Sequence, residues 1–172
     1  MDKKDKKRKS QADIDRQKKR NALKNMYFNR YLMVRYFLAI LLFSNFYWAL
    51  YTWGSWIFVI PAVMLILAVS PCFENIRSYG ETAANMKGTK RYYKAQLAVN
   101  ACLIVLCFTP MFKETMPFLN DTLNSRILAC TIFLIGFILS NASYQRLKKI
   151  DTNNDKQYFR IKQYEKAINL HL

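Results

Sequence analysis

The chain has 172 residues and a strongly unequal charge, with 27 Lys and Arg against 11 Asp and Glu and a formal net charge of +16 at pH 7. It is nevertheless 52% hydrophobic, and its charged and apolar residues are kept apart. Residues 36–73, 95–112 and 127–144 contain no Asp, Glu, Lys or Arg. Because the helices of a soluble domain need a polar face toward water, this pattern excludes an ordinary soluble domain and indicates a membrane protein.

Residues 1–30 form a polybasic segment that carries 12 Lys and Arg. Since it adjoins the first apolar stretch, it meets anionic lipid headgroups before other polyanions, and the inner membrane surface is favoured over nucleic acid as its partner. A solvated basic tail is the alternative. Ser10 and Asp13 have the spacing of a capping box and predict a helix start there. The predicted lipid contacts are Lys3, Lys4, Lys6, Lys7, Arg8 and Lys9.

The apolar stretches predict an all-α fold with four transmembrane helices in two hairpins. Crossing about 30 Å of hydrocarbon takes about 20 helical residues, so residues 36–73 are long enough for two spans. Gly54 marks the break between them, and Tyr and Trp residues gather around it, as they do at a membrane interface. The predicted spans are about 32–53, 56–73, 95–112 and 127–144.

The distribution of positive charge predicts that both termini are cytoplasmic. Lys and Arg number 12 in residues 1–30, 5 in the loop 74–94 and 7 from residue 145 onward. The first hairpin turn has none, and the outer loop 113–126 has 2. Since segments rich in Lys and Arg stay on the side of synthesis, the three rich segments share the inner side. We therefore expect a multi-pass protein of a bacterial plasma membrane.

Residues 145–172 predict a cytoplasmic amphipathic helix. Tyr158, Ile161, Glu165, Ile168 and Leu172 recur every three or four residues and form one mainly apolar stripe. An interfacial helix on the inner leaflet is the direct interpretation, and packing on the loop 74–94 or on a partner protein is the alternative. The predicted lipid contacts of this helix are Arg160, Lys162 and Lys166.

Two intramembrane amides are the candidate polar packing residues. No Asp, Glu, His or Lys falls inside a predicted span, which argues against a proton relay or an ion pathway. Asn45 and Asn100 are expected to bond to each other or to the backbone when the helices pack. The alternative is that they line a site for a polar substrate.

The remaining candidate sites favour structure over chemistry. The segment 151–155 opens like a calcium loop, but Lys156 and Lys162 stand where that loop needs Gly and Glu, so it is interpreted as a turn that caps the last helix. The only histidine, His171, is next to last and has no partner near it in the sequence. The cysteines lie in or beside apolar stretches without metal-site spacing and are interpreted as packing residues. We predict no enzyme, metal or cofactor.

A resemblance to known proteins rests on residues 27–31 (Tyr-Phe-Asn-Arg-Tyr), 35–37 (Arg-Tyr-Phe) and 45–48 (Asn-Phe-Tyr-Trp). With these, the chain resembles small four-helix membrane proteins of Gram-positive bacteria, some of which are catalogued as cellobiose phosphotransferase-system IIA subunits. The IIA label would imply a soluble helical phosphocarrier with a phosphorylatable histidine in its core. This sequence departs from that pattern, because its histidine is near the end of the chain.

The expected function is that of a non-enzymatic integral membrane subunit or scaffold. Its spans would bind another membrane protein or a second copy of the chain, and its basic tails would bind the anionic inner leaflet or a cytoplasmic partner. The alternative is a component of a small transporter or channel, either associated with sugar transport or homo-oligomeric.

Overall fold

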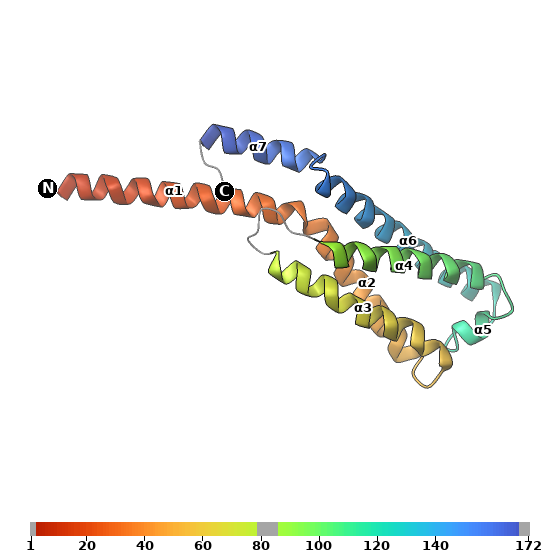
Figure 1. The fold of residues 1–172 in the computed structure, drawn as a ribbon. Coiled ribbons are helices and arrows are strands. Elements are labelled where there is room, and N and C mark those ends of the chain that lie inside the picture. The colour runs from red at the N-terminus through yellow and green to blue at the C-terminus, as the bar shows by residue number, and fades with distance from the viewer. Residues whose placement is uncertain (1–2, 79–85, 169–172) are drawn as a thin grey trace.

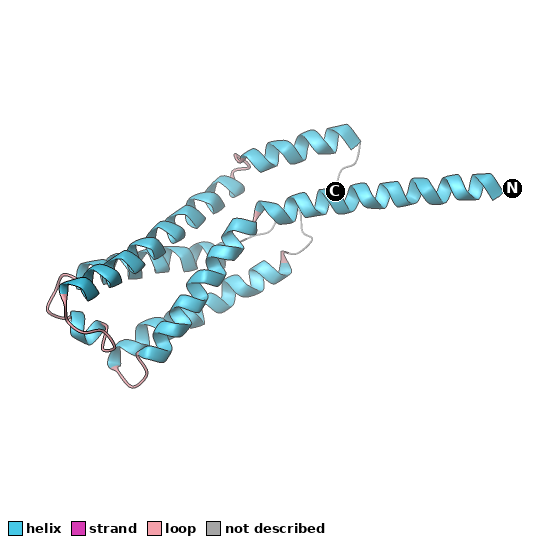
Figure 2. Ribbon diagram, turned by 180° about the vertical axis from the view of Figure 1, so that it is seen from behind, coloured by secondary structure: helices cyan, strands magenta, loops and turns pink. Residues whose placement is uncertain are grey.

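Within the residues that the computed structural model describes, 3–78 and 86–168, the chain is helical and contains no strand (Figures 1 and 2). The prediction of an all-α fold is confirmed. The elements in chain order are α1 (Lys3–Arg30), α2 (Leu32–Tyr51), the short 3-10 helix η1 (Trp56–Phe58), α3 (Val59–Arg77), α4 (Lys87–Leu106), α5 (Phe112–Thr115), α6 (Leu123–Asp151) and α7 (Lys156–Ile168).

Helices α2 and α3 form the first hairpin, with its turn at the predicted place. The chain leaves α2 at Thr52, whose hydroxyl donates to the carbonyl of Trp48 at 2.8 Å. Gly54 has a φ of +85°, in the left-handed region that side chains disfavour, so a glycine allows the chain to reverse here. Trp53 and Trp56 are exposed beside the turn, which suits aromatic rings at a membrane interface.

Helices α4 and α6 pack side by side as the second hairpin (Figure 1). Arg126 closes the connection between them by donating to Asp121 at 2.7 Å and to the carbonyls of Cys107 and Thr109 at 3.2 and 3.1 Å. These carbonyls follow the end of α4, where a helix leaves its last carbonyls without partners inside the helix. One guanidinium therefore satisfies the end of α4 and fixes the start of α6 against it.

The two hairpins meet where α3 contacts the start of α4. The carboxylate of Glu74 accepts hydrogen bonds from the backbone N–H groups of Gly88 (2.7 Å) and Thr89 (2.8 Å), and from the Thr89 hydroxyl (2.8 Å). A carboxylate at this position satisfies free N–H groups and interacts favourably with the helix dipole. A Cβ at Gly88 would collide with Ser70 Oγ, so glycine lets α4 begin directly against α3.

Among the residues that the structure describes, three helical segments are long and apolar enough to cross a membrane, namely α2, Trp56–Arg77 and the segment that contains α6. The predicted span 95–112 is not among the three, so composition supports three spans and not the predicted four. That span falls largely in α4, which begins at Lys87, carries four basic residues in its first two turns and ends at Leu106. Its uncharged part is therefore shorter than expected, and it packs between α3 and α6.

Helix α1 projects past the ends of the other helices (Figures 1 and 2). It begins at Lys3 and continues through Ser10 and Asp13, so the predicted helix start at Ser10 was wrong. The reason is that Lys, Arg, Gln and Ala are good helix formers, and nothing in residues 3–9 interrupts a helix. Only Tyr31 separates the end of α1 from the start of α2, which makes the projecting helix a direct extension of the bundle.

Helix α7 packs its apolar stripe against α1. Ile161 is buried together with Leu23 and Tyr27 of α1, and Glu165 is buried beside them. The apolar stripe predicted from the sequence is therefore present and α1 covers it, while contact of α7 with the inner leaflet stays a prediction. The spacing of a stripe indicates that it needs a cover and does not indicate which surface supplies it. Leu172 lies outside the described residues.

Candidate functional site

A cavity of about 280 Å³ lies between α2, α4 and α6. Its walls are mainly apolar, with Ile40 from α2, Phe118 from the segment after α5, and Phe133 and Ile135 from α6. None of the described residues that line it carries a charge. Ile40 and Ile135 are exposed on the outside of the bundle, so the cavity opens between α2 and α6 toward whatever surrounds these helices.

A chain of three buried amides forms one wall of this cavity. Asn45 Nδ2 donates to Gln96 Oε1 at 3.1 Å, and Gln96 Nε2 donates to Asn100 Oδ1 at 3.2 Å. The same Asn45 nitrogen donates to the backbone carbonyl of Leu41 at 2.7 Å. Each of the three amide side chains is about 4% exposed. The chain of hydrogen bonds therefore connects α2 to α4 inside the bundle, away from both ends of the helices.

The Leu41 carbonyl determines the direction of this amide chain. A carbonyl only accepts hydrogen bonds, so the Asn45 atom that faces it must be the NH₂ group. The second hydrogen of that group then requires the oxygen of Gln96, which leaves the nitrogen of Gln96 to face the oxygen of Asn100. The orientation of all three amides follows from one backbone group, and the chain must end on a donor.

That terminal donor, Asn100 Nδ2, is buried and has no hydrogen-bond partner among the described residues. It lies against α6, where a Cβ built on Gly136 would approach it to 2.8 Å, so only a glycine leaves room for it. A second residue of the cavity lining, Trp48, also has a buried donor without a partner, its Nε1 atom. A buried donor that makes no hydrogen bond costs about 1–3 kcal/mol.

The two predicted packing residues, Asn45 and Asn100, thus line the same cavity and are joined through a third amide. Gln96, which sequence reasoning did not single out, bridges them. The sequence contained a sign of this, because Gln96 and Asn100 are four residues apart and therefore share a helix face. The alternative, a site for a polar substrate, stays a prediction, since the rest of the cavity wall is mainly apolar.

A second polar cluster joins the end of α1 to the start of α7. Arg30 Nε lies 3.1 and 3.2 Å from the carboxylate oxygens of Asp155, and its Nη2 donates to the Ile150 carbonyl at 3.0 Å and to Asn153 Oδ1 at 2.9 Å. The Asp155 side chain is 0% exposed and that of Arg30 only 3%. Arg146 approaches the same carboxylate at 4.0 Å. The carboxylate of Asp155 is therefore surrounded by hydrogen-bond donors and positive charge.

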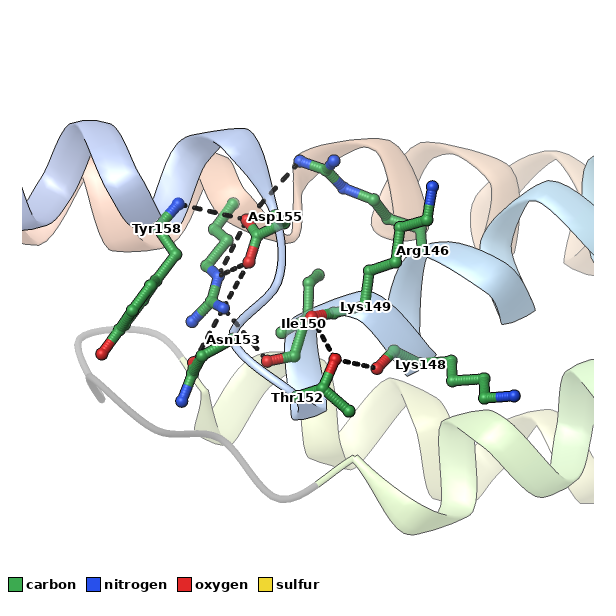
Figure 3. A network of polar contacts seen from close by, with 9 residues as sticks. Arg146, Lys148, Lys149, Ile150, Thr152, Asn153, Asp155 and Tyr158 are labelled. Atoms are coloured by element: carbon green, nitrogen blue, oxygen red, sulfur yellow. Dashed lines mark hydrogen bonds and ion pairs between the residues drawn. The ribbon is translucent and has the colours of Figure 1, made fainter.

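The turn between α6 and α7 holds Asp155 in place (Figure 3). Asn153 has a φ of +52°, which reverses the chain, and Asp155 Oδ2 accepts from the backbone N–H of Tyr158 at 3.3 Å. The prediction that this segment caps the last helix is confirmed. Figure 3 also shows the Asn153 side chain and the Ile150 carbonyl on the same side of the turn as the Asp155 carboxylate. One residue therefore caps α7 and forms the buried ion pair with α1.

A hydrogen bond about three turns further along α7 strengthens this junction. The Tyr27 hydroxyl donates to Glu165 Oε1 at 2.8 Å, and Lys162 donates to Glu165 Oε2 at 2.8 Å. Burial, followed by the bond to Glu165, raises the pKa of Tyr27 to about 12. The hydrogen bond to Glu165 raises the pKa of Lys162 as well. We call this contact of α1 with α7, centred on Tyr27, Arg30, Asp155 and Glu165, the root junction.

The predicted lipid-contacting residues lie on both sides of the root junction. Arg160, Lys162 and Lys166 are exposed on α7, although Lys162 is engaged with Glu165. The six basic residues between Lys3 and Lys9 belong to the first turns of α1, and their side chains lie outside the described residues. Farther along α1, Arg16, Lys18, Lys19 and Arg20 are all exposed. Residues 3–22 of α1, which we call the arm, therefore continue as a basic helix that extends past the bundle (Figure 1).

The two clusters differ in composition. The described residues that line the cavity carry no charge, and the root junction holds a buried ion pair. Within the described residues, no three His, Cys, Asp or Glu side chains gather as metal ligands, and His171 lies outside those residues. Comparison with models of protein families, with curated proteins and with solved structures finds no match.

Proposed function

We propose that this chain is a non-enzymatic integral membrane scaffold, whose bundle lies in the plasma membrane and whose arm binds the acidic surface of a cytoplasmic partner. The single observation that carries the proposal is the arm itself, a basic, exposed helix attached to the bundle through a buried ion pair. A disordered tail would suffice to bring charge near a membrane. A helix fixed at its base instead holds that charge at a defined place.

The length and direction of the arm favour a protein partner over the anionic inner leaflet. Twenty helical residues extend about 30 Å, whereas attraction between exposed charges falls off over about 8 Å at physiological salt. The arm extends past the bundle and does not fold across its end (Figure 1). The tip of the arm is therefore in a better position to contact an acidic protein surface than to contact the lipid headgroups, which lie at the base of the arm. Binding to the inner leaflet requires the arm to lie down.

We propose a topology of four passes with both termini inside, in which α4 crosses the membrane in addition to the three long apolar segments. The ion pair between Lys90 of α4 and Asp151 of α6 supports it, because it places charged ends of both helices at the same end of the bundle as the root junction. A helix packed between neighbours also needs less apolar surface than one surrounded by lipid. The outer face of the bundle is rich in exposed apolar side chains, such as Ile66 and Ile132, which suit either lipid or a second membrane protein.

Thiol labelling of intact cells tests the topology. In a variant without native cysteines, single cysteines at Ser55 and Asn120 should react with an impermeant reagent from outside, and those at Lys87 and Asn154 should not. Lys87 is chosen over its neighbour Gly88, where any side chain would collide with α3. Labelling of Asn154 from outside would overturn the topology.

The arm is tested with a photo-crosslinking amino acid at Arg16 in the full chain in its own membrane, and with a fluorophore at the same position in nanodiscs. We expect protein crosslinks that disappear when Lys18, Lys19 and Arg20 are changed to Gln. They should persist when the exposed Lys148, Lys149 and Lys166 are changed instead. In nanodiscs with anionic lipid, quenchers on the headgroups should leave the fluorophore bright. Strong quenching without crosslinked protein would show that the arm binds lipid and would overturn the scaffold proposal.

A component of a small transporter is the second candidate, favoured by the cavity between α2, α4 and α6. A transport path needs polar groups along its whole length, and in this bundle they are concentrated at the amide chain. Reconstitution of the purified chain in liposomes distinguishes the candidates. Passage of ions or sugars would favour the transporter, and its absence together with partner crosslinks would favour the scaffold.

A further inference from the structure

We propose that the cavity between α2, α4 and α6 binds an uncharged membrane lipid through a carbonyl oxygen, which accepts a hydrogen bond from Asn100 Nδ2. This inference is independent of the scaffold function, because it concerns the bundle and not the arm. It starts from the end of the amide chain, a donor that is buried and lacks an acceptor.

The chemistry of the recognised group follows from the direction of the amide chain. The Leu41 carbonyl forces Asn45, Gln96 and Asn100 to donate in sequence, so the chain presents N–H to the cavity. The other buried polar atom of the lining without a described partner, Trp48 Nε1, is also only a donor. A ligand that completes these bonds must therefore bring acceptor oxygen. A carbonyl provides two lone pairs and no competing donor.

The ligand must also be uncharged. No described residue of the lining is ionisable at neutral pH, so a carboxylate or phosphate in the cavity would lack a counter-ion. Burying an unpaired charge costs far more than one hydrogen bond returns. Free fatty acids in their ionised form and intact phospholipid headgroups are excluded for this reason.

Water satisfies only part of the cavity. An internal water needs two to four polar partners, which the amide end offers and the walls of Ile40, Phe133 and Ile135 do not. The rest of the space therefore suits hydrocarbon. Because Ile40 and Ile135 are exposed at the rim, a molecule dissolved in the bilayer reaches the cavity sideways between α2 and α6.

Two kinds of membrane lipid share this chemistry. One is a neutral glyceride, whose ester carbonyl is followed by an acyl chain, and the other is a quinone, whose ring carbonyl is attached to an isoprenoid chain. A cavity of about 280 Å³ accommodates the carbonyl with the adjoining ring or first part of the chain, while the remainder extends between the helices into the lipid. The structure assigns the shared group, and experiment has to distinguish the sources.

Tryptophan fluorescence of the full chain in dodecyl maltoside, a detergent without a carbonyl group, tests the proposal. Changing Trp53 and Trp56 to Phe leaves Trp48, at the cavity, as the only reporter. Dioleoylglycerol, decylubiquinone and squalene, which is an oxygen-free hydrocarbon, are titrated separately. We expect saturable changes with the first, the second or both, and a much weaker one with squalene. Saturation by one carbonyl compound alone identifies the source.

Two variants and one matched control make the result specific. Asn100→Leu removes the donor and should weaken binding about tenfold, the equivalent of about 1.4 kcal/mol. Ser44→Phe adds bulk at the rim, where Ser44 is exposed, leaves the amide chain intact and should block entry. Asn141→Leu removes an exposed amide from α6, outside the cavity lining, and should bind like the parent.

The proposal is overturned if neither carbonyl compound saturates, which would leave water as the occupant, or if squalene binds as tightly as they do. It is also overturned if Asn100→Leu binds like the parent. Should that variant fail to fold, Ser44→Phe decides, because undiminished binding to it would place the ligand elsewhere.

Discussion

The two polar clusters of this protein follow opposite rules. At the root junction, Arg30 and Asp155 are charged, buried and paired with each other, and the guanidinium also donates to the Ile150 carbonyl and to Asn153. In the bundle, Asn45, Gln96 and Asn100 are neutral, equally buried and end on a donor that has no partner among the described residues. The ion pair makes the first cluster a structural joint. The second cluster is a candidate binding site, because its terminal amide N–H lacks an acceptor and a ligand that supplies one is stabilised by the new hydrogen bond.

The largest expected effect on stability comes from breaking the buried ion pair of the root junction. Asp155→Ala leaves the Arg30 guanidinium buried without its counter-ion and should lower the free energy of unfolding by about 3–5 kcal/mol. Denaturation in detergent micelles, followed by circular dichroism, measures this. The double variant Arg30→Met with Asp155→Ala should recover part of the loss, since no charge is then buried alone. A double variant as unstable as the single one would mean that Asp155 acts mainly as the cap of α7.

The amide chain should respond with a smaller loss. Gln96→Leu leaves both Asn45 and Asn100 without the partner that joins them and should cost about 1–3 kcal/mol in the same assay. Changing Asn45, Gln96 and Asn100 together to Leu should be less harmful than Gln96→Leu alone, because none of the three amides then remains buried without its partner. If the triple variant loses as much free energy of unfolding as the three single Leu variants together, the amides contribute by packing and not as a connected chain.

Arg126 offers an intermediate case, a charged group that is partly exposed. Arg126→Ala removes the cover from the carbonyls of Cys107 and Thr109 and its hydrogen bond to Asp121, which lowers the pKa of that carboxyl group. Solvent screening makes the expected loss of stability smaller than at the two buried clusters. Faster amide hydrogen exchange in residues 107–126 would confirm the role. Asp121→Asn, which leaves the carbonyl contacts in place, should have a smaller effect.

The smallest effect concerns pH at the root junction. The pKa of Tyr27 is raised from 10 to about 12, so the neutral phenol is favoured in the folded state. Its contribution is complete below pH 10 and is lost as the pH rises toward 12. The distribution of distances between spin labels at the exposed Lys24 and Gln163 should broaden as the pH rises from 10 to 12. In Tyr27→Phe the change should be weaker, with only the Lys162 contact to Glu165 left to titrate. An equal change in both would exclude Tyr27 as its cause.

The positions of the helices could be predicted from the sequence because hydrophobic length and charge act locally. Residues 32–53 and 127–144 lie in or around α2 and α6, and the turn at Gly54 is where it was expected. The boundaries of α1 and α4 could not be predicted in the same way. A capping pattern at Ser10 does not start a new helix when the residues before it are already helical. Lys87 to Lys94 likewise belong to α4 although they read as loop.

The partners of the polar residues were beyond a reading of the sequence alone. Asn45 and Asn100 stood out because each lies well inside an apolar stretch, but Gln96 lies at the edge of one, two residues after Lys94. The pairing of Arg30 with Asp155 joins residues 125 positions apart, and nothing local marks either as a partner of the other. The stripe on α7 was visible, whereas its cover, α1, was set by the arrangement of the whole chain.

The sequence separation between Arg30 and Asp155 has a consequence for biosynthesis. A ribosome that adds about 5–20 residues per second needs roughly ten seconds to travel from one to the other. During that interval the first hairpin is already available to the membrane, while the amino-terminal helix swings freely with its guanidinium hydrated. The ion pair with Asp155 can fix this helix only after residue 155 has been synthesised. Aborted or clipped products that stop short of residue 155 would retain their spans and yet present the basic helix at no fixed angle.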